Sequence, residues 1–142
     1  MMDDLDFFPK SIGRLNKQMQ KIFGEELKSC DLSSAHALYM MVLYENDGIT
    51  MKELTENVGM DKANTTRVVR ALKSKGYIYT DPEVEGTRKY KVYLTEEGKK
   101  AAEIVKASIT KMLDKIFSIL TETEREQYIA ILKKIITNIN NR

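Results

Sequence analysis

The chain has 142 residues, of which 42% are apolar and 31% charged, and its net charge is +2. This length fits one compact domain, or one small domain with an oligomerisation arm. A single cysteine excludes an internal disulfide framework, and the lack of a long apolar run excludes a membrane-spanning helix. Because the chain begins with the acidic stretch Met-Met-Asp-Asp-Leu-Asp, which argues against a signal peptide, we expect a cytoplasmic protein with no membrane partner.

Residues 4–29 predict one long amphipathic helix, because apolar side chains recur every three or four positions. Its regular part is expected to begin near Phe8 or Pro9, since proline is tolerated only near the start of a helix. The apolar stripe consists of Leu5, Phe8, Ile12, Leu15, Met19, Ile22, Phe23 and Leu27. It fits either an ordinary core face or one side of a dimer interface.

A second helix is predicted from a cap at Asp31 or Ser33 to about Glu45. The side chains expected on its inward face are Ala37, Leu38, Met41 and Val42. Residues 46–48 (Asn-Asp-Gly) then predict a turn, and residues 49–50 fit a short strand beside a later hairpin.

A helix-turn-helix follows, and it is the part around which the chain is organised. A capping box between Thr50 and Glu53 begins its first helix. Gly59 supplies the positive φ of a tight turn, and Asp61 caps a second helix that runs from Lys62 to about residue 75.

The outer face of this second helix carries side chains that hydrogen-bond to phosphates and base edges. The expected DNA-binding residues are Lys62, Asn64, Thr65, Thr66, Arg67 and Arg70. Asn and Arg make bidentate contacts in a major groove, and Thr touches a thymine methyl. Any exposed helix carries Lys and Arg, so the interpretation depends on the glycine turn before the helix and the hairpin after it.

A β-hairpin is predicted with strands at 77–80 and 90–94. A hairpin that follows a recognition helix makes a winged helix-turn-helix, whose wing residues Arg88 and Lys89 are expected to contact a phosphate backbone or a minor groove. From residue 61 to residue 91 the chain has eight Lys/Arg against four Asp/Glu. Positive charge is thus concentrated where the DNA-reading elements are predicted.

The wing and its flanks resemble the MarR family of bacterial transcriptional regulators, and the resemblance covers nearly the whole chain. The matching residues are Gly76-Tyr77-Ile78 and the pattern Arg88-x-x-x-Val92-x-Leu94-Thr95-x-x-Gly98. Family members carry Asp-x-Arg-x-x-x-Val-x-Leu-Thr-x-x-Gly at this place. Gly86 stands where the Asp is expected, and Thr80 stands where an Arg often follows the recognition helix. Since the family Asp helps to hold the wing arginine, Arg88 is expected to be held differently, with Glu85 as the candidate partner.

Two further amphipathic helices are predicted after the wing, one capped by Thr95 and one beginning with a capping box at Thr121 and Glu124. With the first helix they supply three apolar stripes, more than a small central domain covers. We therefore expect a homodimer, because a two-fold interface is self-complementary. The resemblance implies the same dimer, formed by interdigitating terminal helices.

The predicted domains are a dimerisation helix at 1–30, a winged helix-turn-helix DNA-binding domain at 31–95 and dimerisation helices at 96–142. The expected fold class is mainly α with a small β-hairpin wing and with N- and C-terminal helical dimerisation arms.

Three single residues have both a functional and a structural interpretation. Cys30 fits a redox switch, since some relatives sense peroxides through a cysteine, or a small apolar residue that is partly buried. His36 and Tyr39 lie one turn apart, near the place where the family has a small-molecule pocket. They fit a site for an aromatic or phenolic effector, or simple packing. One His and one Cys do not supply the ligands of a metal site, and no cofactor is expected.

Catalytic motifs are missing from the chain: there is no Gly-rich phosphate loop, no nucleophile elbow and no His at a recognisable spacing from Cys or Ser. We expect a transcriptional regulator and not an enzyme, a repressor that binds a pseudo-palindromic operator in double-stranded DNA as a homodimer. A small-molecule or redox signal is expected to release it. The alternative is a winged-helix protein-interaction module without specific DNA binding.

Overall fold

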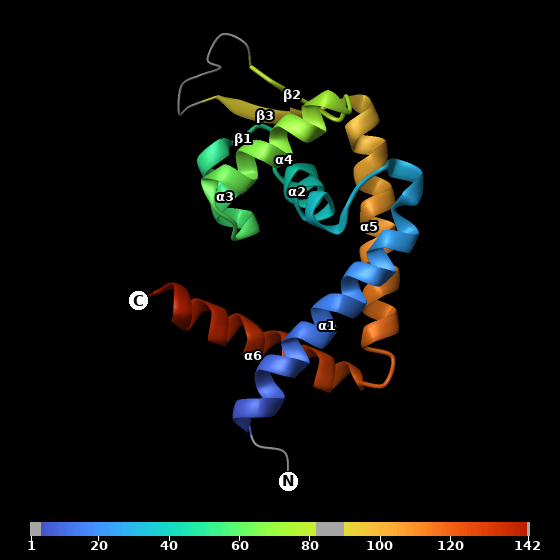
Figure 1. The fold of residues 1–142 in the computed structure, drawn as a ribbon, viewed down its shortest axis with the longest axis vertical. Helices are drawn as coiled ribbons and strands as arrows, with labels where there is room; N and C mark the ends of the chain where they lie inside the picture. Colours follow the sequence, from blue (N-terminus) through green and yellow to red (C-terminus); the bar gives the residue numbers. More distant parts are fainter. Residues whose placement is uncertain (1–3, 82–89, 142) are drawn as a thin grey trace. The chain divides into compact units, whose positions relative to one another are not determined.

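The computed structural model describes residues 4–81 and 90–141. In these ranges the chain is mainly helical with a small antiparallel sheet, which confirms the predicted winged helix-turn-helix architecture (Figure 1). The chain divides into two compact units, Met1–Ile109 and Thr110–Arg142. The first unit holds the helix-turn-helix and the sheet, and the second holds the last helix. None of the helices in the described ranges is long and apolar enough to cross a bilayer.

The first helix, α1 (Asp4–Glu26), is followed by a single 3-10 turn, η1 (Lys28–Cys30). The expected start near Phe8 or Pro9 is wrong, because the helix already begins at Asp4. Pro9 lies in the second turn, where its ring removes one amide donor without ending the helix. The two ends of the apolar stripe differ in solvent exposure: Phe23 is buried, whereas Leu5 at the other end is 84% exposed.

The second helix, α2 (Ser34–Glu45), lies at the centre of the first unit and packs against α1, α3, α4 and β3 (Figure 1). Ser33 is its N-cap and accepts a hydrogen bond from the His36 amide at 3.2 Å. The predicted inward face is partly wrong, because Leu38 is 43% exposed. The buried side chains are Ala37, Tyr39, Met40 and Leu43.

The helix-turn-helix consists of α3 (Met51–Val58) and α4 (Lys62–Ser74), joined by a turn in which Gly59 has φ 78°. The predicted capping box of α3 is confirmed, since the Glu53 amide donates to Thr50 Oγ1 at 3.2 Å and Glu53 Oε1 accepts from the Thr50 amide. Asp61 caps α4 through a 2.7 Å bond from the Asn64 amide to its carboxylate. The tight turn lets α3 pack against α4 while both pack on α2.

The sheet has three strands in the order β1 (Ile49–Thr50), β3 (Lys91–Leu94), β2 (Ile78–Thr80). Both pairings are antiparallel, so the predicted third strand beside the hairpin is confirmed. The face toward the helices carries the buried side chains Ile49, Ile78, Val92 and Leu94. On the outer face the rings of Tyr79 and Tyr93 stack with centroids 5.1 Å apart.

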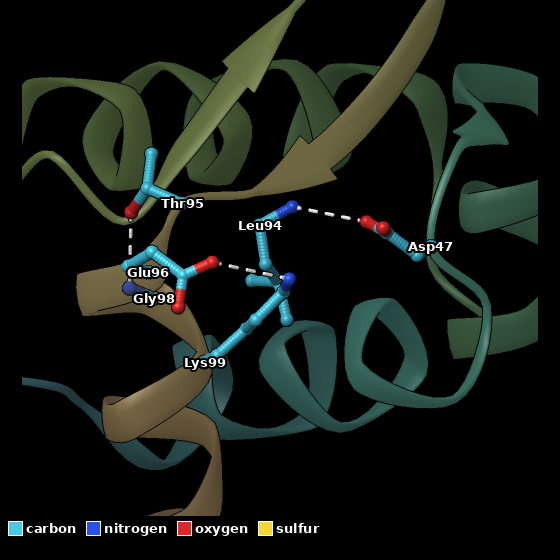
Figure 2. A network of polar contacts seen from close by, with 6 residues as sticks. All are labelled: Asp47, Leu94, Thr95, Glu96, Gly98 and Lys99. Atoms are coloured by element: carbon cyan, nitrogen blue, oxygen red, sulfur yellow. Dashed lines mark hydrogen bonds and ion pairs between the residues drawn. The ribbon is translucent and has the colours of Figure 1, made fainter.

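The sheet is joined to α5 (Glu96–Ile116) by a network of backbone and side-chain hydrogen bonds, part of which Figure 2 shows. Thr95 Oγ1 accepts from the Gly98 amide at 3.0 Å and donates to the Gly76 carbonyl at 2.6 Å. The Leu94 amide donates to Asp47 Oδ1 at 3.3 Å. A Cβ atom on Gly98 would lie 1.9 Å from the Tyr77 carbonyl oxygen, so this position admits no side chain unless the backbone moves.

In the second unit, α6 (Glu122–Asn140) begins with the predicted capping box, in which Thr121 Oγ1 accepts from the Glu124 amide at 3.1 Å. Before the helix, the Phe117 ring meets the Tyr128 ring edge to face, with centroids 5.9 Å apart. The Arg125 guanidinium lies over the same Phe117 ring at 5.2 Å. Farther along α6 the side chains of Ile131, Ile135, Ile136 and Ile139 are exposed.

Candidate nucleic-acid interface

Helix α4 presents a cationic face to solvent. It contains four basic residues and no acidic residue, and the side chains of Lys62, Arg67 and Arg70 are all exposed. Arg70 makes no hydrogen bond or ion pair within the described ranges, so its guanidinium is available to a ligand. The opposite face of α4 is anchored in the core by Val68, Val69 and Leu72. An exposed, uniformly cationic helix face attracts phosphate groups.

The expectation that Thr65 lies on this outer face is wrong. Its side chain is fully buried, and its Oγ1 donates to the Asp61 carbonyl at 3.1 Å. It also lies 3.0 Å from the Tyr39 hydroxyl on α2. Positions 65, 68, 69 and 72 follow helical spacing and share one face, so Thr65 is held on the core side of α4.

Asn64 and Thr66 lie at the border between the two faces, and both are half-buried. Asn64 Nδ2 donates to the Tyr39 hydroxyl at 3.0 Å, and Asn64 Oδ1 accepts from Arg67 Nη2 at 3.2 Å. Thr66 Oγ1 donates to the Lys62 carbonyl at 2.9 Å. The structure therefore brings Asn64 and Arg67 together, and it connects both to a residue of α2.

Tyr39, expected either to contact a small molecule or simply to pack, is packed in the described structure. Its side chain is fully buried, and its hydroxyl is used by Thr65 and Asn64. A buried tyrosine hydroxyl needs a hydrogen-bond partner, and here α4 supplies it in place of a ligand. This link between α2 and α4 was not predicted, although a tyrosine in the middle of a mostly apolar helix is the signal for such a partner.

His36 is half-buried near the ion pair between Asp31 and Lys75, whose Oδ2 and Nζ atoms lie 2.8 Å apart. Partial burial holds the pKa of His36 below its usual range, and the positive charge of Lys75 acts in the same direction. Hydrogen bonding and attraction from Lys75 lower the pKa of Asp31. His36 Nδ1 is buried and has no hydrogen-bond partner in the part of the chain that the structure describes.

The Cys30 thiol is buried, 3.9 Å from Ser29 Oγ, and the Cys30 carbonyl accepts a hydrogen bond from the Tyr77 hydroxyl at 2.8 Å. This bond ties the turn η1 to the residue that precedes β2. Within residues 4–81 and 90–141, no group of three or more His, Cys, Asp or Glu side chains is placed to hold a metal ion.

Four residues that the sequence predicts in the wing lie outside the described residues, namely Glu85, Gly86, Arg88 and Lys89. The base of the wing is described. Thr80 is buried there and accepts a hydrogen bond from Lys73 Nζ at 3.2 Å. Helix α4 and the hairpin are therefore joined directly by a polar contact.

Comparison with known proteins places this architecture among bacterial and archaeal regulators. A model of the MarR family matches residues 32–89. The HTH-type transcriptional regulator YybA of Bacillus subtilis is 28% identical over 130 residues, which are 92% of this chain and 87% of YybA. The HTH-type transcriptional regulator SarZ of Staphylococcus aureus is 26% identical over 126 residues, which are 89% of this chain and 79% of SarZ.

Solved structures show the same fold. A MarR transcriptional regulator from Methanosarcina mazei Go1 superposes with a TM-score of 0.85 at 26% identity and covers 99% of this chain and 94% of its own. The MepR protein of S. aureus, solved as a DNA complex, superposes with a TM-score of 0.82 at 22% identity, covering 92% of this chain and 97% of its own.

Proposed function

The chain belongs to the MarR family of transcriptional regulators, and from this premise we propose that it represses transcription by binding a pseudo-palindromic operator as a homodimer. The family consists of transcriptional regulators and not of enzymes. The observation that carries the proposal is the outer face of α4, where Arg67 and Arg70 are exposed and no acidic side chain opposes them. MepR, which shares the fold, was solved bound to DNA.

Each subunit would place α4 in a major groove, with its N-terminal half toward the base edges. Arg67 suits base reading, because a guanidinium makes bidentate contacts to guanine. Arg70 and Lys62 suit phosphate contacts. Arg88 and Lys89 are proposed to reach the flanking backbone or minor groove from the tip of the wing. Since the relatives are regulators of bacteria and archaea, where DNA lies in the cytoplasm, we propose a cytoplasmic location for the protein.

The proposed dimer is supported by apolar side chains that each unit leaves uncovered. In the first unit they are Leu5, Phe7, Phe8 and Ile12 on α1, and in the second they are Ile131, Ile135, Ile136 and Ile139 on α6. Apolar surface of this extent on helices is typical of a partner interface. We accordingly retain residues 1–30 and 96–142 as dimerisation arms and residues 31–95 as the DNA-binding domain. Two-fold symmetry then sets the half-sites about one DNA turn apart, roughly 34 Å.

Release from DNA is proposed to follow from linkage. Two α4 helices bind the operator only when their spacing matches that of successive grooves. A ligand or redox change that favours a different spacing therefore lowers the affinity for the operator. His36 and Cys30 are the candidate residues for such a signal, since they lie where α1, η1 and α2 meet. An aromatic or phenolic effector remains the proposed ligand class.

The test is selection of duplex DNA from a random pool, followed by fluorescence anisotropy of the enriched sequence across a range of salt concentrations. We expect an enriched palindrome that binds about 10³-fold or more tighter than bulk DNA. We also expect an affinity that falls steeply with log salt, because each phosphate contact releases counterions. Failure to enrich any sequence, together with weak binding at low salt, would favour a winged-helix protein-interaction module.

A further inference from the structure

A chain of hydrogen bonds runs from the exposed Arg67 into the core of the first unit. Thr65 Oγ1 donates its only proton to the Asp61 carbonyl at 3.1 Å, so the 3.0 Å bond to Tyr39 is donated by the tyrosine. The Tyr39 oxygen in turn accepts from Asn64 Nδ2 at 3.0 Å. Asn64 Oδ1 accepts from Arg67 Nη2 at 3.2 Å. Every donor in the chain therefore points the same way, from Arg67 inward.

This direction fixes the orientation of the Asn64 amide. The Tyr39 hydroxyl has given its proton to Thr65 and is left as an acceptor, so it selects the amide nitrogen of Asn64. The amide oxygen must then point the other way, where it meets the guanidinium of Arg67. With the amide reversed, Asn64 would present a donor to another donor. Chains of aligned hydrogen bonds also strengthen one another.

Burial decreases along this series of hydrogen bonds when it is followed from the core to the surface. Tyr39 and Thr65 are fully buried, Asn64 is half-buried and Arg67 is exposed. The rigid end therefore lies in the core, and the exposed end is the side chain that the proposed function places at a base edge. Arg70, on the same helix face, has no such restraint among the described residues.

We propose that Tyr39 and Asn64 are positioning residues that hold Arg67 in the geometry with which it reads a base. This inference rests on the proposed function. Asn64 is thereby a support of Arg67, because its Oδ1 accepts from Arg67 Nη2 while its Nδ2 donates to the Tyr39 hydroxyl. Tyr39 acts on DNA only through Asn64 and Arg67. The specificity of α4 is thus set partly from α2.

The expected effect of this support on DNA affinity follows from the entropic cost of ordering a side chain. An arginine that is already held loses less freedom on binding, which is worth about 2- to 10-fold in affinity for each copy. A dimer has two copies, so loss of the support is expected to lower the ratio of specific to non-specific affinity by about 4- to 100-fold. Non-specific binding depends on phosphate contacts and changes little.

The substitution Tyr39→Phe removes the hydroxyl and keeps the ring. Thr65 retains its bond to Asp61, and the half-buried Asn64 amide regains a partner from water, so the fold is expected to persist. Tyr77→Phe is the matched control, since it deletes a hydroxyl that donates to the Cys30 carbonyl and has no bond to α4 side chains. We expect anisotropy titrations at one salt concentration to show a lower specificity ratio for Tyr39→Phe and an unchanged ratio for Tyr77→Phe.

The second variant, Asn64→Ala, acts at the partly exposed end and does not threaten the core. It is expected to lower the specificity ratio as Tyr39→Phe does, and combining the two is expected to add nothing. In an Arg67→Ala background neither substitution should lower the ratio further. If Tyr39 and Asn64 acted only on stability, Tyr39→Phe and Asn64→Ala would leave the specificity ratio unchanged both with Arg67 present and in the Arg67→Ala background. That result would overturn the proposal.

A measurement without DNA separates this inference from the proposed function. Nitrogen-15 relaxation of the arginine Nε–H groups is expected to show Arg67 more restricted than Arg70 in the free protein, and Tyr39→Phe should release Arg67 only. Equal mobility of Arg67 and Arg70 in the unsubstituted protein would overturn the proposal. If the protein binds all DNA sequences alike, the proposed function fails, and the relaxation of Arg67 alone then decides whether the support exists.

Discussion

Replacing Gly98 by alanine should destabilise the protein, against the usual effect of this substitution in a helix. Gly→Ala in an exposed helix ordinarily stabilises by about 0.5–1 kcal/mol. At Gly98 the new Cβ would lie 1.9 Å from the Tyr77 carbonyl oxygen and 3.2 Å from Leu94 Cδ2. The contact at Tyr77 involves backbone, so no side-chain rotation relieves it.

The size of the effect follows from what must move. Ordinary contact begins at 3.4 Å, so the carbonyl and α5 must separate by about 1.5 Å. That shift breaks the 3.0 Å bond from the Thr95 amide to the Tyr77 carbonyl and strains the Thr95 cap on Gly98. Breaking one hydrogen bond costs about 1 kcal/mol and overpacking about 1–3 kcal/mol, which gives a destabilisation of about 2–4 kcal/mol.

Urea unfolding followed by circular dichroism measures this destabilisation, with all variants at one protein concentration because the stability of a dimer depends on it. Gly24→Ala is the control, since a Cβ there meets nothing within 4 Å in the described structure and should stabilise α1 slightly. If Gly98→Ala raised the unfolding midpoint as Gly24→Ala does, the close approach between α5 and the residue before β2 would be refuted.

Three further predictions concern charge, pH and assembly. Affinity for DNA falls as salt rises, and Arg70→Ala should make this fall less steep, reducing the magnitude of the slope of log affinity against log salt by about 1 for each phosphate that Arg70 neutralises. An unchanged slope would show that Arg70 does not touch phosphate. Because burial lowers the pKa of folded His36, the unfolded chain binds more protons below pH 6.5, so stability should decrease as the pH falls from there toward the folded pKa. Urea unfolding at a series of pH values should show that His36→Gln removes this part of the pH dependence of stability. If the variant and the unsubstituted protein had the same pH profile, His36 would not be the group responsible. Ile12→Asp places a charge on the exposed apolar stripe of α1 and should shift the protein toward monomer in sedimentation velocity. The control is Lys17→Asp, which also introduces an aspartate but on the polar side of α1, and it should not cause this shift.

Local chemistry in the sequence predicted the parts of the fold that depend on neighbours in the chain. The caps at Thr50 and Thr121 and the positive φ of Gly59 were expected from residue type and spacing, and all three are present. The hairpin strands followed from alternation of apolar and polar side chains. These features could be predicted because a cap or a tight turn is determined by fewer than six residues.

The features that escaped prediction depend on the third dimension. Helix α2 is apolar nearly all round, so periodicity did not identify its buried face, and Leu38 was placed inside while Met40 was missed. Thr65 was assigned to the DNA side because it is polar, although it shares its helical face with Val68 and Leu72. Its burial depends on Tyr39, 26 residues earlier, whose hydroxyl satisfies it. Spacing was the better guide than polarity at that position.

The same limit applies to the site. Charge and the neighbouring elements predicted the cationic residues of α4, whereas the hydrogen bonds that join Arg67 to Asn64 and Tyr39 depend on how α4 packs against α2. Two residues expected to touch ligands, Thr65 and Tyr39, instead hold α4 to α2. The wing residues Arg88 and Lys89 stay predictions, since they lie outside the described residues.

The central claim is that a homodimer places two α4 helices in successive major grooves, and the spacing of half-sites tests it most directly. Anisotropy would compare the selected operator with a version carrying about 5 extra base pairs at its centre, which turns one half-site to the opposite face of the duplex. We expect the affinity for the lengthened operator to fall to near the non-specific level. Equal affinity for both duplexes would contradict it, because each subunit would then bind its half-site independently of the other.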